Sequence, residues 1–220
     1  KSRSVSSTHN QVFNIISSVG GDKALAPNLT AAEYSFSDFD FLNNGFNAPY
    51  SSSASYSCNT NSATYVAWCW KAGGAAVANN DGSISSQVSV NRKAGFSIVA
   101  YTGNGTIGST VGHGLGVKPD WVIIKCRSNT DNWMVYHNQA NEGSSPEDEY
   151  FELNGTGGDI NSVIMMNDTA PTSSVFSLQD DNSVNANTRT YIAYCWNEIP
   201  GYSKFGGFKG NNNVDGQVIN

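Results

Sequence analysis

"TYVAWCW" at residues 64–70 returns almost unchanged as "TYIAYCW" at residues 190–196. Both stretches are rich in β-branched and aromatic residues, which favour β-strands. Apolar residues occupy both alternating positions, which is typical of a central strand with two covered faces. The side chains on one face of such a strand should be buried, and these are Val66, Trp68, Ile192 and Tyr194.

Shorter repeated segments occur in the same order along the chain. "KSRS" at 1–4 returns as "KCRS" at 125–128, "VF" at 12–13 as "VY" at 135–136, and "NLT" at 28–30 as "NGT" at 154–156. The offsets stay between 123 and 126 residues, so chance is a poor explanation. We infer two copies of one unit, because self-similarity at a fixed period indicates a repeat architecture.

A third, partial copy is indicated at the C-terminus, where "FKGNNN" at 208–213 resembles "YTGNGT" at 101–106. We therefore expect the chain to begin after a unit's first strands and to end inside the first strand of another. The expected division is a first sandwich unit at 1–72 that lacks its first strands, a linker or insert at 73–94, a second unit at 95–204, and the beginning of a third at 205–220. The alternative for "SQVSV", within the insert, is an edge strand.

The composition suits short strands joined by polar turns. Only 14% of the 220 residues are charged, and 22 are glycine. Turn signals such as "NDG" and "NGTGG" separate the strand-like segments. This pattern predicts an all-β fold of two tandem antiparallel β-sandwich repeats, of the jelly-roll or concanavalin-like type.

The net charge is −6 and the isoelectric point is near 4.9, which argues against a nucleic-acid partner. No apolar run approaches the roughly 18 residues of a membrane helix, so no membrane partner is expected. No cofactor is expected either.

The four cysteines are Cys58, Cys69, Cys126 and Cys195, and none has the CxxC spacing of a zinc site. Cys69 and Cys195 are equivalent in the two copies and lie in aromatic-rich strands. The favoured interpretation is buried thiols that serve as small apolar side chains. The alternative is two disulfides, Cys58 with Cys69 and Cys126 with Cys195, outside a reducing cytosol.

The sequence offers no catalytic set. His113 in "VGHGLG" has no GxSxG partner motif and is interpreted as part of a turn. The carboxylates Glu147, Asp148, Glu149 and Glu152 could serve glycoside hydrolysis, but a solvated charged loop is favoured because the first copy has no such cluster. Asp180 and Asp181 lack the spacing of an EF-hand calcium loop. We assign no catalytic, cofactor-binding or metal-binding residue.

Asparagine sequons and tryptophans raise two possible links to sugars, which are glycosylation and glycan binding. Sequons begin at Asn28, Asn104, Asn154 and Asn167, and a repeated turn explains the equivalent pair Asn28 and Asn154 without glycosylation. Trp68, Trp121 and Trp133 could stack on a glycan, although their strand positions favour core packing.

Four quoted segments carry a family resemblance: "TYVAWCWKAGG", "GFSIVAYTGNGTIGSTVGHGLGVKPDWVIIKCRS", "DNWMVYHN" and "AYCWNEIPGYSKFG". Over almost its whole length the chain resembles an uncharacterised repeat domain of virion proteins, notably tail-fibre-like ones, from marine and freshwater bacteriophages. "HGLGxxPxWVIIK" is the most specific motif. The resemblance implies a lectin-like β-sandwich with a structural or adhesive role, outside the cell or on the virion surface, and it transfers no catalytic residue.

The predicted function is a structural subunit of an extracellular fibre, filament or phage appendage, and not an enzyme. Its main partner would be itself, head to tail, with the C-terminal segment supplying a strand to the incomplete first unit of the next subunit. The predicted subunit-contact residues are Phe205, Phe208, Val214, Val218 and Ile219. The alternative explanation is that the chain is part of a longer polypeptide, whose neighbouring units complete the two partial units covalently. The alternative function is a glycan-binding adhesion module for a surface polysaccharide, and a depolymerase comes third.

Overall fold

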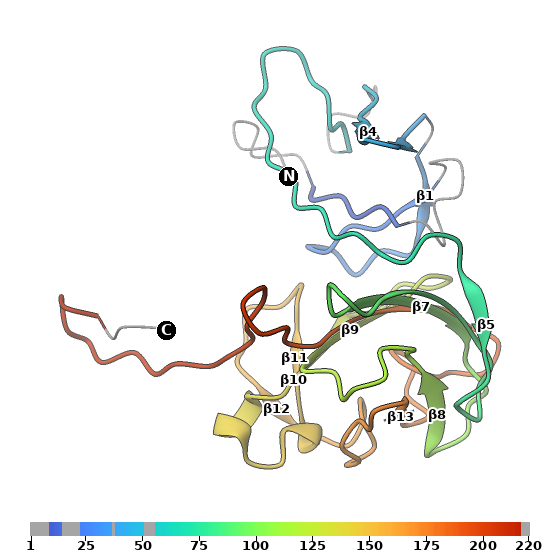
Figure 1. Ribbon diagram of the computed structural model, residues 1–220, viewed down its shortest axis with the longest axis vertical. Helices are drawn as coiled ribbons and strands as arrows, with labels where there is room; N and C mark the ends of the chain where they lie inside the picture. The colour runs from blue at the N-terminus through green and yellow to red at the C-terminus, as the bar shows by residue number, and fades with distance from the viewer. Residues whose placement is uncertain (1–8, 15–22, 37, 51–55, 217–220) are drawn as a thin grey trace.

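The computed structural model describes residues 9–14, 23–36, 38–50 and 56–216, and it is an all-β protein with antiparallel sheets (Figure 1). Its only helical pieces in these ranges are two 3₁₀ turns, η1 (Ala140–Gly143) and η2 (Pro146–Asp148). No helix in the described ranges is long and apolar enough to cross a membrane.

Eight strands form one large antiparallel sheet in the order β12-β11-β10-β9-β14-β7-β6-β5. Their bounds are β5 (Val77–Asn79), β6 (Ser86–Asn91), β7 (Phe96–Thr102), β9 (Trp121–Cys126), β10 (Trp133–His137), β11 (Glu149–Glu152), β12 (Ile160–Asn161) and β14 (Thr190–Trp196). The central position of β14, between β7 and β9, confirms the expectation for "TYIAYCW".

Side chains of β14 alternate between two cores because successive residues of a strand point to opposite faces. Tyr191, Ala193 and Cys195 pack into the inner core, and Ile192, Tyr194 and Trp196 pack into the outer core. Ile192 is 0% exposed and Tyr194 is 6% exposed, so both are buried as expected. A run that is apolar at both alternating positions thus fills both faces of one strand.

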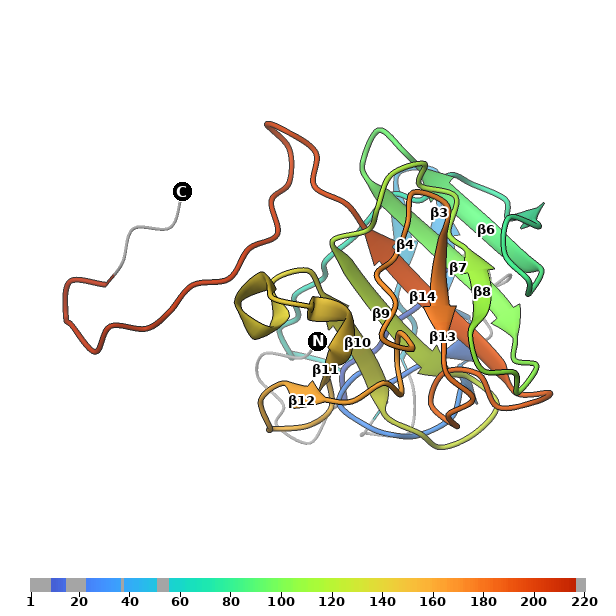
Figure 2. The same ribbon diagram turned by 90° about the horizontal axis from the view of Figure 1, so that it is seen from below.

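The inner core lies inside the curve of the large sheet. The hairpin-like pair β8 (Ser109–Gly112) and β13 (Val175–Leu178) covers it there, as Figures 1 and 2 show. Phe176 and Leu178 of β13 are fully buried against the sheet. This second layer makes the region sandwich-like.

The N-terminal part covers the outer face of the same sheet (Figure 1). It contains β1 (Lys23–Ala24), β2 (Tyr34–Ser35), β3 (Asp40–Leu42) and β4 (Gly45–Asn47). Leu25 inserts from it into the outer core and is 0% exposed. Ala24, Phe36 and Phe39 form a small separate cluster on its other side.

The expected linker at 73–94 is wrong for most of its length. β6 lies within the large sheet between β7 and β5, and β5 is the edge strand, so "SQVSV" is not an edge either. Val88 is buried in the inner core, and this burial gives the segment its place in the sheet. The "NDG" turn lies between the two strands.

The expected burial in "TYVAWCW" is wrong. Residues 66–70 are described and form no strand; Trp68 is 67% exposed and Val66 is half-buried. The named strands of the described part of the chain lie elsewhere, so residues 66–70 do not take part in a ladder like that of β14.

Candidate functional site: the contact between the N-terminal part and the large sheet

The four candidate carboxylates do not converge on a cavity. Glu149 is buried and accepts a hydrogen bond from Asn161 Nδ2 at 2.9 Å, and Glu152 accepts one from Asn132 Nδ2 at 2.6 Å. Glu147 and Asp148 lie on η2. The contacts of Glu149 and Glu152 are therefore local to the β11 region.

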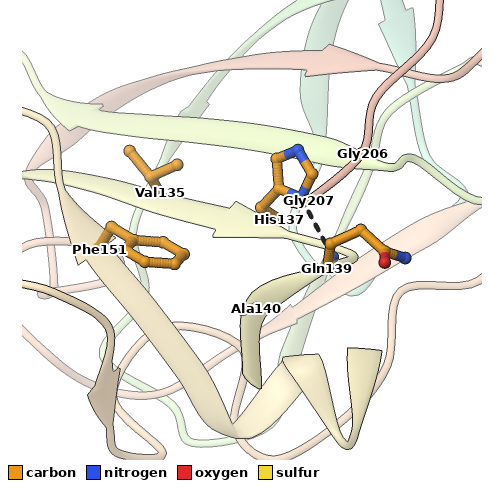
Figure 3. Close-up of a pocket in the computed structure, with 7 residues that line it drawn as sticks. All are labelled: Val135, His137, Gln139, Ala140, Phe151, Gly206 and Gly207. Carbon is orange, nitrogen blue, oxygen red and sulfur yellow. Dashed lines mark hydrogen bonds between the residues drawn. The ribbon is translucent and has the colours of Figure 1, made fainter. Parts of the chain in front are cut away.

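Two cavities among the described residues are lined by other groups. One of about 240 Å³ is lined by Val135, His137, Gln139, Ala140, Phe151, Gly206 and Gly207 (Figure 3). The other, of about 560 Å³, is open and is lined by Lys71, Ala72, Gly73, Gly74, Val90, Asn91, Arg92 and Lys93. No carboxylate lines either cavity.

Metal-ligating groups do not cluster in the described part of the chain, where no three His, Cys, Asp or Glu side chains could hold one ion. Asp181 accepts the backbone N–H of Ser183, and Asp180 is exposed. His113 is fully buried, its Nδ1 accepts the N–H of Leu115, and burial lowers its pKa. This arrangement fits the structural role expected for His113.

All four cysteines are free thiols. Cys126 lies opposite Tyr191 and Cys195 lies opposite Val122, so the two sulfurs are four residues apart along neighbouring strands, about 13 Å. A disulfide needs Cα atoms within about 7 Å, which excludes this pair. Cys195 is buried as expected and burial raises its pKa to about 12, whereas Cys69 is exposed, contrary to expectation.

The three tryptophans proposed for sugar stacking differ in exposure. Trp133 is 1% exposed, and its indole N–H donates to the carbonyls of Ala26 and Leu29. Trp121 is half-buried and stacks on Trp196 with ring centroids 4.5 Å apart. Only Trp68 presents its ring to solvent.

The "KCRS" segment holds the N-terminal part against the sheet. Lys125 is fully buried, and its Nζ donates to the carbonyls of Thr30 and Asp131, each at 3.0 Å. Burial lowers the pKa of Lys125 to about 8. Arg127 binds Glu33 with two hydrogen bonds of 3.1 and 2.9 Å, and the Glu33 N–H donates to the Arg127 carbonyl.

This contact was not predicted from the sequence, although its residues were noticed as a repeat. Bidentate arginine–carboxylate pairs are among the stronger and more directional polar contacts. Here one such pair, one buried lysine and one indole N–H converge on residues 26–33, which we call the 26–33 turn.

The pairing of β1 with β2 recurs 126 residues later as the pairing of β11 with β12. The matched pairs are Lys23–Ser35 with Glu149–Asn161, and Ala24–Tyr34 with Tyr150–Ile160. The bridge between Val12 and Leu25 likewise matches the pairing of Val135 with Phe151. The same three-stranded pattern is therefore present in both places.

Loop hydrogen bonds follow the same spacing. The bond from Leu29 N to Ala26 O corresponds to that from Gly155 N to Glu152 O. The bond from Ala63 N to Thr60 O corresponds to that from Arg189 N to Ala186 O. The bond from Thr60 N to Tyr65 Oη corresponds to that from Ala186 N to Tyr191 Oη. The side-chain oxygens of Asn28 and Asn154 each accept a backbone N–H from the adjacent strand segment, at 2.9 and 2.8 Å. These two asparagines thus have the same role in a turn.

The C-terminal segment leaves the body of the molecule (Figure 1). Phe205 still packs against Trp121, with ring centroids 5.9 Å apart. Further on, Phe208 is 69% exposed and Val214 is 100% exposed. The predicted contact residues Val218 and Ile219 lie outside the described residues.

Comparison with known proteins gives one match. A family model described as "Domain of unknown function (DUF7483)" matches residues 1–220. No curated protein and no solved structure matches the chain significantly. Since the family model spans the whole sequence, the chain belongs to the DUF7483 family.

Proposed function

We propose that this protein is a structural subunit of an extracellular fibre, filament or phage appendage, built from tandem β-sandwich repeats. The observation that carries the proposal is the recurrence, at a spacing of 126 residues, of the β1–β2 pairing and of several loop hydrogen bonds. Tandem repeats bury surface chiefly against their neighbours, so arrays of them make extended structures. We propose no enzymatic activity.

Assembly would use the two exposed segments. In the large sheet β14 pairs with β7, with Tyr191 opposite Tyr101. By the sequence match of "FKGNNN" to "YTGNGT", Phe208 is the counterpart of Tyr101, and Tyr65 is the counterpart of Tyr191. The C-terminal segment of one subunit would therefore pair with residues 64–70 of the next, with Phe208 opposite Tyr65.

This register is an instance of β-strand addition, in which main-chain hydrogen bonds supply affinity and alternate side chains supply specificity. Exposed apolar side chains on both partners support it, namely Trp68, Trp70, Phe208 and Val214. A head-to-tail contact of this kind builds an open filament unless its rotation closes a ring.

Deleting residues 206–220 and imaging the purified protein by electron microscopy tests the proposal. We expect wild-type filaments and single truncated subunits. Phe208→Ser should weaken assembly, and Ile107→Ser is a matched control because Ile107 is an exposed apolar side chain at 59% on a loop of the second unit. Unchanged filaments from the truncated chain would eliminate strand exchange.

A second candidate is a glycan-binding adhesion module, favoured by the exposed indoles of Trp68 and Trp70, which are 67% and 55% exposed. Aromatic faces with one wet side suit stacking on sugars. A glycan array probed with the wild-type chain and with Trp68→Ala separates the two candidates. A specific signal that the variant loses favours adhesion, and no signal favours a purely structural protein.

A further inference from the structure

The larger of the two cavities is a groove between the end of β6 and the segment at residues 71–74. Its volume is about 560 Å³, and three exposed basic side chains line it, Lys71, Arg92 and Lys93. No acidic residue lines it. We call it the basic groove. It is a positively charged site on a protein whose net charge is −6.

One wall of the basic groove is held against β6 by side-chain hydrogen bonds. The Gly73 N–H donates to Ser89 Oγ at 3.1 Å, and Asn91 Nδ2 donates to the Lys71 carbonyl at 3.0 Å. A Cβ atom on Gly73 would lie only 2.0 Å from the Val90 carbonyl oxygen, so a residue with a side chain does not fit there. The wall that carries Lys71 is therefore preformed.

The opposite wall is the turn that joins β6 to β7. The Ala94 N–H donates to the Asn91 carbonyl at 3.1 Å, which closes the turn around Arg92 and Lys93. Arg92 Nε donates to the Gly114 carbonyl at 2.8 Å. Within the described part of the chain, the terminal nitrogens of this guanidinium have no hydrogen-bond partner. They are therefore available to a ligand.

None of the three cations is neutralised by a carboxylate of the described residues. The ion pairs there are Arg127 with Glu33, Arg189 with Asp131, and Lys209 with Glu142. A groove lined by charges of one sign concentrates ions of the opposite sign. The basic groove therefore suits a ligand that carries negative charge.

We propose that the basic groove binds an acidic polysaccharide, one whose sugars carry carboxylate or sulfate groups. Arg92 binds an oxyanion through two guanidinium nitrogens, and Lys71 and Lys93 act as point charges. The three cations lie outside residues 64–70 and 206–220. The inference therefore goes beyond the proposed assembly and does not depend on strand exchange.

An exposed indole at the same end of the large sheet favours a sugar chain over a single small anion. Asn91 and Trp196 both lie opposite Phe96, one on each side of it. Trp70 packs edge to face on Trp196, is 55% exposed, and directly precedes Lys71. Aromatic faces with one wet side suit stacking on sugars. A polysaccharide can therefore contact the cations and this indole together.

The rest of the molecule disfavours a nucleic acid. The other nine of the 12 basic residues are outnumbered by 18 acidic ones. Duplex DNA carries one negative charge per about 1.7 Å of its axis, so it would extend beyond three cations onto an acidic surface. An acidic polysaccharide carries its charges farther apart, and a short stretch of it matches the basic groove.

Binding of the full chain to three polymers tests the proposal. The probes are dextran sulfate, polygalacturonate and neutral dextran, and affinity is measured by biolayer interferometry on protein that sedimentation shows to be monomeric. We expect binding to one or both charged polymers, none to dextran, and weaker binding at high salt. The two charged polymers distinguish recognition of sulfate from recognition of carboxylate.

Variants of the groove locate the binding. The triple variant Lys71→Gln, Arg92→Gln and Lys93→Gln should bind at least about tenfold more weakly, and Arg92→Gln alone about two- to fivefold, as for exposed ion pairs. Lys209→Gln is the matched control, because Lys209 is an exposed lysine outside the groove, and it should bind as the wild type does. Unchanged urea unfolding verifies that each variant is folded.

No binding to either charged polymer, or equal binding by the triple variant, would overturn the proposal. Stronger binding of duplex DNA than of both charged polymers would overturn it as well, because the groove would then accept polyanions in general. Full competition by low concentrations of inorganic phosphate would reduce it to a small-anion site and would also overturn it. All measurements use monomers, so electron microscopy still judges the proposed function separately.

Discussion

Residues 190–196 and 64–70 differ at only two positions, yet one stretch is the centre of the protein and the other lies at its surface. Tyr194 in β14 is 6% exposed, whereas its counterpart Trp68 is 67% exposed. β14 has β7 on one side and β9 on the other. Local propensity is the same in both stretches, so the available neighbours decide which becomes a strand.

The comparison shows that a sequence of this kind forms a buried strand only where other segments cover its faces and pair with its edges. Its apolar side chains need cover on two faces, and its backbone N–H and C=O groups need ladders on two edges. Where the chain supplies these, "TYIAYCW" is buried. In "TYVAWCW" the indoles of Trp68 and Trp70 stay exposed instead, and this exposure supports the proposed assembly.

The largest expected difference is in stability. Ile192→Ala should lower the free energy of unfolding by about 2 to 5 kcal/mol, because it leaves a cavity in the fully buried outer core. The matched change Val66→Ala should cost less than about 1 kcal/mol, since Val66 is only half-buried. Urea unfolding of both variants checks the contrast, and equal losses would break it.

The paired cysteines should differ in reactivity. Cys69 is exposed, and Cys195 is buried with its pKa raised to about 12 by burial. A thiol reagent at pH 8 should modify Cys69 at least about 100-fold faster than Cys195, since the thiolate is the reactive form. Cys69→Ser should remove the fast phase and Cys195→Ser should not. Fast labelling of Cys195 in the folded protein would contradict its place in β14.

The buried Lys125 of the "KCRS" segment leads to a pH prediction. Because burial lowers the pKa of Lys125 from 10.5 to about 8, the unfolded chain binds more protons than the folded chain between these values. The free energy of unfolding should therefore rise with pH in this window, by up to about 1.4 kcal/mol per unit. Two sets of groups oppose the rise because burial raises their pKa values: the Cys195 thiol from about pH 9, and the buried tyrosines above about pH 10.

From pH 8 to 9.5, Lys125 should contribute a gain of about 1 to 2 kcal/mol, measured as the difference in pH dependence between the wild type and Lys125→Met. Lys125→Met should remove this gain, and Lys93→Met should keep it because Lys93 is exposed. The same pH dependence in the wild type and in Lys125→Met would show that Lys125 titrates normally in the folded state.

Much of the fold was predictable because its signals are local. The apolar parity of "TYIAYCW" correctly predicted a central strand, and the turn-rich composition predicted an all-β protein. The contact of Lys125 and Arg127 with the 26–33 turn could not be predicted. In the sequence, a buried lysine that binds carbonyl groups cannot be told from a solvated one. The sequence predicts a linker where β5 and β6 lie, because small residues surround them. In the fold β6 pairs with β7, and β5 pairs with β6.

The smallest expected effect belongs to Trp68→Ala. Tryptophan in a core costs about 3 to 5 kcal/mol to truncate, but a side chain that is 67% exposed leaves little cavity, so we expect a loss below about 1 kcal/mol in a dilute monomer. The same variant should weaken filament assembly, because the proposed strand exchange covers residues 64–70. A loss above about 3 kcal/mol in monomeric protein would mean that Trp68 is covered within its own chain. The two stretches would then be equivalent after all, and residues 64–70 could no longer explain assembly as an exposed segment.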